Sequence, residues 1–209
     1  MKAERAIVDD SISKLKITRF IEQRLGRAGI ANIEIQKTPV ITRITIYTKS
    51  PGKVIGRGGE TITNITKEIN EKFGISNAQI NVNEIENEWL EPKLVARFIS
   101  DSFEKGLNKR RILHYAVMKV MQNGALGVEI AATGMLAGKG VRSKQIKIRL
   151  GYLPKAGNVT NLVKKAKLAS NPKFGIIGIK VSIVPPGTEF PDRTVKKVEI
   201  PKSLEAGAS

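Results

Sequence analysis

The sequence predicts an α+β fold in two domains, and three observations lead to this prediction. The first 86 residues change between helix and strand patterns in the order helix, strand, strand, short helix, glycine turn, helix, strand. An acidic stretch at 84–88, followed by Trp89 and Pro92, then marks a domain boundary. Beyond it, two helical stripes come before several alternating segments, which indicates two helices packed on a mostly antiparallel sheet.

The first half begins with an amphipathic helix, predicted from Ser13 as its N-cap to Ala28. Its apolar stripe consists of Ile17, Phe20, Ile21, Leu25 and Ala28. Two strands are expected next, at 32–35 and 42–46, because apolar and polar residues alternate there. The pair Thr38-Pro39 separates them.

The stretch Val54–Gly59 is the most specific local pattern in the chain. A short helix starting near Pro51 enters a turn that holds three glycines and Arg57. Glycine has no Cβ, so such a turn lets backbone N–H groups approach an anion closely. The helix that follows adds the positive end of its dipole. The apolar stripe of this helix consists of Ile62, Ile65, Ile69 and Phe73. A strand is expected after it, at 79–83.

The second half is predicted to start with two helices joined by a short loop. The first begins at Pro92, where proline is well tolerated, and the second begins at Lys109. The apolar stripe of the first helix is Leu94, Val95, Phe98, Ile99 and Phe103. That of the second helix is Leu113, Ala116, Val117, Val120 and Met121. Alternation predicts strands at 128–133, 145–150 and 177–184, with a further strand considered within 158–167. Residues 186–209 are expected to form an extended or disordered tail.

The charge points to a polyanionic partner. The chain carries 36 basic and 19 acidic residues, a formal net charge of +17. Between Lys105 and Lys173 there are 15 basic residues and one acid, Glu129. A solvated surface usually mixes both signs, so this imbalance favours nucleic acid, with an acidic membrane surface as the other candidate. No apolar run approaches the ~18–20 residues of a membrane span, and the first residues lack the apolar core of a secretory signal.

Catalytic chemistry finds little support in the residues. The chain has no cysteine and a single histidine, His114, which argues against zinc sites and nucleophilic triads and fits a reducing cytoplasm. The stretch 134–140 resembles a phosphate-binding loop, but it is one residue short and no Ser or Thr follows its lysine. The acids of 84–88 are better explained as a linker than as metal ligands. We therefore predict no catalytic residue, cofactor or metal, and no small-molecule substrate.

The first half resembles the KH domain. Its signature V-I-G-x-x-G is matched in full by Val54–Gly59, and the extra helix and strand before the core unit resemble the type II arrangement. The resemblance covers residues 17–86. It implies a three-stranded sheet with helices on one face and a loop that clamps about four nucleotides of single-stranded RNA. Gly56 and Gly59 would allow close approach, Arg57 would contact phosphate, Gly58 would keep the loop open, and Lys53 lies nearby.

The second half, at 91–185, resembles the C-terminal domain of the ribosomal protein S-three family. The matching stretches are 127–130, 134–138, Arg142 and 175–181, and residues 143–167 look like the archaeal and eukaryotic branch. The family is the KH-containing protein of the small-subunit head. The resemblance implies partners in small-subunit rRNA, neighbouring head proteins and mRNA on the path by which it enters the subunit. Arg110 and Arg111 match a basic pair on that path, where His114 stands at a position that is basic in bacterial relatives.

The alternating strand around Lys147 supplies the clearest basic surface that follows from the residues themselves. Apolar residues occupy one face and basic ones the other, as expected for a sheet that lies on rRNA. With the residues implied by the resemblance, the predicted RNA-binding set is Lys53, Gly56, Arg57, Gly58, Gly59, Lys109, Arg110, Arg111, Lys139, Arg142, Lys144, Lys147, Arg149, Lys164, Lys165 and Lys167.

The favoured function is a structural, non-enzymatic constituent of the small ribosomal subunit, in the cytoplasm. The alternative is a free KH-domain regulator that binds single-stranded mRNA. A nucleic-acid-cleaving or lyase enzyme is a third class, but it would need a nucleophile or metal cluster that the sequence does not offer. The basic second half argues against a free regulator, which has little use for 15 basic residues against one acid.

Overall fold

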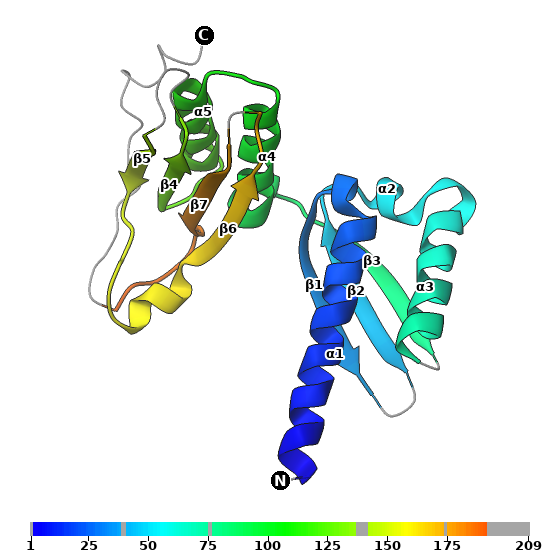
Figure 1. Cartoon of the computed structure of the whole chain (residues 1–209). Helices are drawn as coiled ribbons and strands as arrows, with labels where there is room; N and C mark the ends of the chain where they lie inside the picture. The colour runs from blue at the N-terminus through cyan, green and yellow to red at the C-terminus, as the bar shows by residue number, and fades with distance from the viewer. Residues whose placement is uncertain (1, 39–40, 75–76, 137–141, 174, 192–209) are drawn as a thin grey trace. The chain divides into compact units, whose positions relative to one another are not determined.

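The computed structural model divides the chain into two units, Met1–Glu86 and Asn87–Ser209 (Figure 1). It describes residues 2–38, 41–74, 77–136, 142–173 and 175–191. Within those ranges, no helix combines the length and the apolar character needed to cross a membrane.

The first unit is a three-stranded sheet with its helices on one face. In order along the chain, its elements are α1 (Lys2–Arg24), the 3-10 turn η1 (Gly26–Ala28), β1 (Ile30–Lys37), β2 (Thr42–Thr48), α2 (Pro51–Ile55), η2 (Arg57–Gly59), α3 (Glu60–Phe73) and β3 (Ala78–Glu84). The strand order is β1-β2-β3, with β1 antiparallel and β3 parallel to β2. A parallel pair needs a crossover, and α2 and α3 supply it.

Apolar rows across this sheet form its core. Ile44 of β2 pairs with Ile35 and Ile80 on its two neighbours, and Ile46 pairs with Ile33 and Val82. Ile44 and Ile46 are fully buried under the stripes of α1 and α3. Each such side chain contributes roughly 1.5–3 kcal/mol of hydrophobic free energy before the cost of ordering it.

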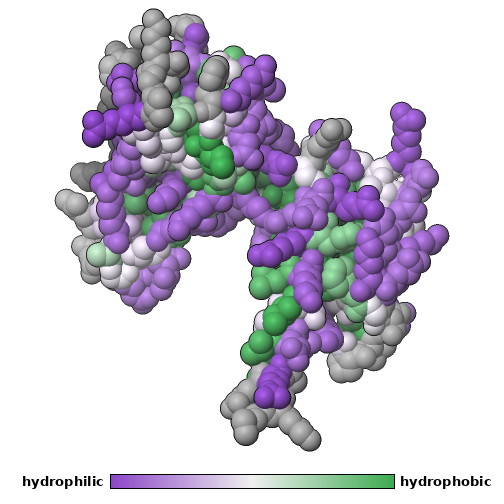
Figure 2. All heavy atoms as spheres, in the orientation of Figure 1, coloured by the Kyte–Doolittle hydropathy of each residue, from purple (hydrophilic) through white to green (hydrophobic). Residues whose placement is uncertain are grey.

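The predicted start of the first helix, at Ser13, is wrong. α1 begins eleven residues earlier, at Lys2, and the Ser13 hydroxyl donates to the Asp9 carbonyl at 2.8 Å inside the helix instead of capping it. An ion pair of 2.6 Å between Asp10 and Lys37 joins this added part of the helix to β1. Ile7, Val8 and Ile12 on this added part are exposed, and so is Leu15 just after it. Figure 2 shows hydrophobic residues along α1.

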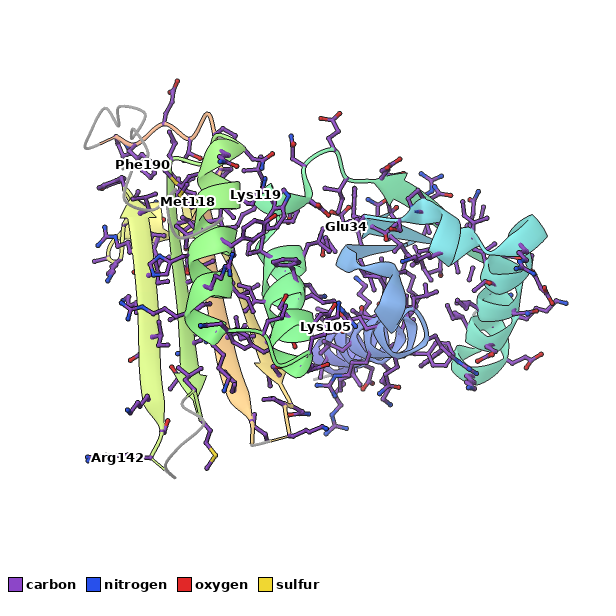
Figure 3. All side chains as sticks on the ribbon, turned by 90° about the horizontal axis from the view of Figure 1, so that it is seen from above. Glu34, Lys105, Met118, Lys119, Arg142 and Phe190 are labelled. Carbon is purple, nitrogen blue, oxygen red and sulfur yellow. The ribbon has the colours of Figure 1, made fainter. Side chains whose placement is uncertain are left out.

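The second unit packs two helices on a four-stranded sheet. Its elements are η3 (Glu88–Leu90), α4 (Pro92–Glu104), α5 (Lys109–Gln122), β4 (Gly127–Gly134), β5 (Lys144–Gly151), η4 (Asn158–Leu162), β6 (Lys164–Ser170) and β7 (Ile177–Val184). The strand order is β5-β4-β7-β6, and every pair is antiparallel. Figure 3 looks onto the helix-covered face, where α5 packs on β4 and β5 and α4 on β6 and β7. These two sheets with their helices confirm the predicted α+β fold class.

The core of this unit lies between the helices and the sheet. Phe103, Leu113, Ile130, Ile179 and Ile183 are among its largest members, and none is more than 1% exposed. All of the predicted α5 stripe is buried, as expected from its 3.6-residue period.

One member of the predicted α4 stripe, Phe98, does not belong to this core, because its side chain is 39% exposed. Phe98 lies at the edge of the buried stripe, beside rings from η3 and α5.

Two segments late in the chain differ from their predicted form. Residues 158–162 are a 3-10 turn, and the further strand starts only at Lys164 and runs to Ser170. After β7, the first residues of the predicted tail stay on the second unit. There Phe190 is only 9% exposed and its ring lies 5.1 Å from that of Tyr152. The rest of that tail, 192–209, lies outside the described residues.

Candidate nucleic-acid interface

The first candidate contact is the glycine loop, Gly56–Gly59, between α2 and α3. Gly56, Gly58 and Gly59 have φ angles of 77°, 60° and 80°, a region that L side chains rarely adopt. The loop leads directly into α3, whose N-cap Gly59 offers no side chain to cap the first turn, although the Glu60 N–H is bonded to the Arg57 carbonyl. Lys53 and Arg57 are exposed on either side of Gly56.

Gly56 is the position where only glycine fits. A Cβ there would lie 2.1 Å from Thr61 Oγ1 and 2.7 Å from Thr61 Cβ. Gly58 and Gly59 would meet nothing within 4 Å. Gly56 therefore closes the turn onto α3, while Gly58 leaves the solvent side of the loop open.

The second candidate contact is the start of α5. The Asn108 side chain caps the helix by accepting from the Arg110 N–H at 3.2 Å. Lys109 is half-buried, and its ammonium donates to the Met135 carbonyl at 2.7 Å, so it holds the end of β4. Arg110 and Arg111 are exposed. Three adjacent basic residues thus divide into one structural lysine and two surface arginines.

The third and largest candidate contact is the outer face, defined as the side of the four-stranded sheet opposite α4 and α5. The register places Lys147, Ala131, Lys180 and Lys167 side by side across all four strands. The next row is Arg149, Glu129, Ser182 and Lys165. Neighbouring strands lie about 4.8 Å apart, so this row spans about 14 Å. The five cations of the outer face are all exposed: Lys147, Arg149, Lys165, Lys167 and Lys180.

The single acid of the outer face is paired. Glu129 is ion-paired with Lys147 at 3.0 Å and with Lys155 at 3.4 Å. Partial burial acts to raise its pKa, but the hydrogen bonds and charges of the two lysines outweigh this and leave the pKa below its ordinary value. The hydrogen bond to Glu129 likewise raises the pKa of Lys147. The whole face keeps an excess of positive charge.

Other predicted residues lie away from the two outer-face rows. Lys144 is exposed at the start of β5, and Arg142, which Figure 3 labels, is exposed two residues before it. Lys164 alternates with Lys165, so it faces the helix side and forms an ion pair with Glu91. Lys139 lies outside the described residues.

Sequence reasoning missed Lys180. It lies between the buried Ile179 and Val181 on β7, so the alternation already placed it on the polar face. The alternation does not give the order of the strands in the sheet. In the structure β7 lies next to β6, and β4 separates it from β5. Lys180 thereby connects the two predicted clusters into one surface.

Comparison with known proteins supports both halves of this architecture. The family model described as "KH domain" matches residues 16–90, and that described as "Ribosomal protein S3, C-terminal domain" matches residues 99–183. A protein named "Small ribosomal subunit protein uS3" from Methanococcus maripaludis strain C5 is 36% identical over 97% of this chain and 96% of its own. The chain belongs to the uS3 family. Proteins of the same name from Methanococcus aeolicus and Methanocaldococcus jannaschii are 35% and 36% identical, each over 93% of both chains.

The uS3 match extends across both units and the segment that joins them. It confirms the resemblance that the glycine loop and the second-half motifs indicated. Among the described residues, no group of three or more His, Cys, Asp or Glu could hold a metal ion. The individual RNA-binding residues stay predictions.

Proposed function

We propose that this protein is a structural, non-enzymatic constituent of the small ribosomal subunit that binds rRNA through its outer face. The observation that carries this proposal is the meeting of five exposed cations from β5, β6 and β7 on one sheet face. Phosphate contacts of this kind supply affinity and little sequence information, which suits a protein fixed on folded rRNA. Neighbouring ribosomal proteins would contact other surfaces of the assembled chain.

The glycine loop and the start of α5 have separate roles in this proposal. Both would meet RNA in extended form: the loop as a backbone clamp, and Arg110 and Arg111 on the path by which mRNA enters the subunit. Neither site alone would anchor the protein, because each offers only a few cations. Lys109, held by the Met135 carbonyl, would position the helix instead of touching RNA.

A charge-removal experiment tests the outer face. Lys147, Lys167 and Lys180 lie in one row, and changing all three to Gln removes three charges from it. We expect weaker binding to purified small-subunit rRNA and a slope of log affinity against log salt that is smaller by about 2. The matched control changes three exposed lysines elsewhere, Lys16, Lys67 and Lys105, to Gln.

Equal losses in the two triple variants would show that net charge, and not the outer face, holds the RNA. Sedimentation gives a second test. The native protein should travel with small subunits in a low-salt lysate, and its release there would sink the ribosomal proposal. If the protein were instead a free regulator, its binding to single-stranded mRNA should depend on Arg57. Changing Lys147, Lys167 and Lys180 to Gln should then leave that binding unaffected.

A further inference from the structure

Three aromatic rings from three elements meet on the helix side of the second unit. The ring of Trp89 in η3 lies 5.3 Å from that of Phe98 in α4 and 6.3 Å from that of Tyr115 in α5. The Phe98 and Tyr115 rings are 6.1 Å apart. These three residues are called the aromatic cluster. Phe98 is 39% exposed and the other two rings are half-buried, so the cluster faces solvent in part.

Cations flank the cluster along α5. The Lys119 ammonium lies 5.7 Å from the centre of the Tyr115 ring, and Figure 3 labels Lys119 on this helix. Arg111 stands one turn before Tyr115, as Lys119 stands one turn after it. Acids come from the other two elements: Glu88 directly precedes Trp89 in η3, and Asp101 follows Phe98 by one turn in α4, whereas α5 carries no acid. The rings therefore have positive charge along one side.

The composition of this surface favours RNA over a protein partner. Protein interfaces are enriched in aromatic residues and arginine, but they are depleted in lysine and bury further apolar surface around the rings. Among the described residues of this unit, the other large hydrophobic side chains that are exposed lie outside η3, α4 and α5: Leu107, Leu162 and Ile176. Rings beside cations, without an aliphatic surround, are the combination that binds single-stranded nucleic acid.

We propose that Trp89, Phe98 and Tyr115 form a stacking platform for unpaired bases of single-stranded RNA, with Arg111 and Lys119 beside the RNA backbone. This inference rests on the proposed RNA-binding function, but it assigns the unpaired bases to a surface distinct from the outer face. Stacking on ring faces tolerates any base, so the platform would hold passing RNA without reading its sequence.

The chain supplies its own probe, because Trp89 is its only tryptophan. Titrating the full chain with an eight-nucleotide oligouridine should quench Trp89 emission to saturation, and added salt should reverse the effect. A blunt RNA duplex of equal charge should leave the emission unchanged, since its bases are already stacked. The affinity for a fluorescein-labelled copy of each RNA is measured in parallel by anisotropy.

Variants separate stacking from packing. Phe98→Leu and Tyr115→Leu keep apolar side chains but remove the rings, and together they should weaken oligouridine binding roughly tenfold. Phe98→Tyr keeps a ring and should bind as the wild type does. Far-UV circular dichroism and the midpoint of urea unfolding check that each variant folds.

Each other outcome overturns the platform. Labelled oligouridine that binds with constant Trp89 emission would place the bases elsewhere and leave the outer-face function standing. Equal quenching by the double Leu variant would show that the rings are packing residues. Quenching by purified small-subunit proteins, but not by RNA, would assign the cluster to a protein partner. Failure of wild-type protein to bind any RNA would remove the proposed function as well.

Discussion

The carboxylate of Glu129 lies between the ammonium groups of Lys147 and Lys155, at 3.0 Å and 3.4 Å, on a strand face whose other charged residues are cations. The Glu129 side chain is 16% exposed and that of Lys147 is 42% exposed. A lone carboxylate at this point reduces the repulsion among the lysines and also lowers the charge that RNA meets. The charge of Glu129 should therefore raise the stability of the fold and lower its affinity for RNA.

Replacing Glu129 with Gln should separate these two effects. The side chain keeps its size and loses its charge, so the free energy of unfolding should fall by about 1 kcal/mol. The affinity for rRNA should rise several-fold at low salt, because Lys147 and Lys155 become available to phosphate. Urea unfolding and filter binding measure the two quantities. A variant that binds RNA more weakly would contradict the placement of RNA on the outer face.

The same residue should make stability depend on acid. The pKa of Glu129 in the folded protein lies below the ordinary value of 4.5, so the unfolded chain takes up the proton first as the pH falls. Its contribution is complete above 4.5 and declines as the pH falls through the folded value. Unfolding free energies of wild type and Glu129→Gln, measured between about pH 3 and pH 7, should converge on the acid side. A constant difference across that range would show that the ion pairs contribute nothing.

Two glycines of the loop should respond differently to alanine. Gly56→Ala combines a φ of 77° with a Cβ that meets Thr61 Oγ1 and Cβ, so it should cost roughly 2–4 kcal/mol in the stability of the first unit. Gly58→Ala has the same kind of backbone but open space around the Cβ, and it should cost only about 1–2 kcal/mol. Urea unfolding of the full chain compares them. Equal costs would mean that Thr61 moves aside freely.

Lys109 and Arg110 should also behave differently, although they are neighbours. Lys109→Met removes the bond to the Met135 carbonyl and should lower the unfolding free energy of the second unit by about 1–3 kcal/mol. Arg110→Met should leave stability within about 0.5 kcal/mol, because its side chain is exposed. The same two variants, measured for RNA binding, should show the larger loss with Arg110. The reverse order would make Lys109 the RNA contact.

Much of the fold was predictable because its signals are local. The stripe of α5, the alternation of β4 and the glycine loop each follow from spacing along a few turns or a few residues. The start of α1 was missed because Ser13 offers the same hydroxyl to a helix end and to a carbonyl inside a helix. Phe98 fitted the core stripe by spacing, but its position at the edge of that stripe leaves the ring beside Trp89 and Tyr115.

The sequence by itself determined which residues are basic, which side of each strand they face and where the glycine loop stands. Only the tertiary structure decided that β7 lies between β4 and β6, which brings Lys180 beside Lys167 and completes the row from Lys147. Only it gave Lys164 an acidic partner from outside its own strand, Glu91. The reason is physical: alternation along a strand is a property of the backbone, whereas strand order results from packing between residues far apart in the chain.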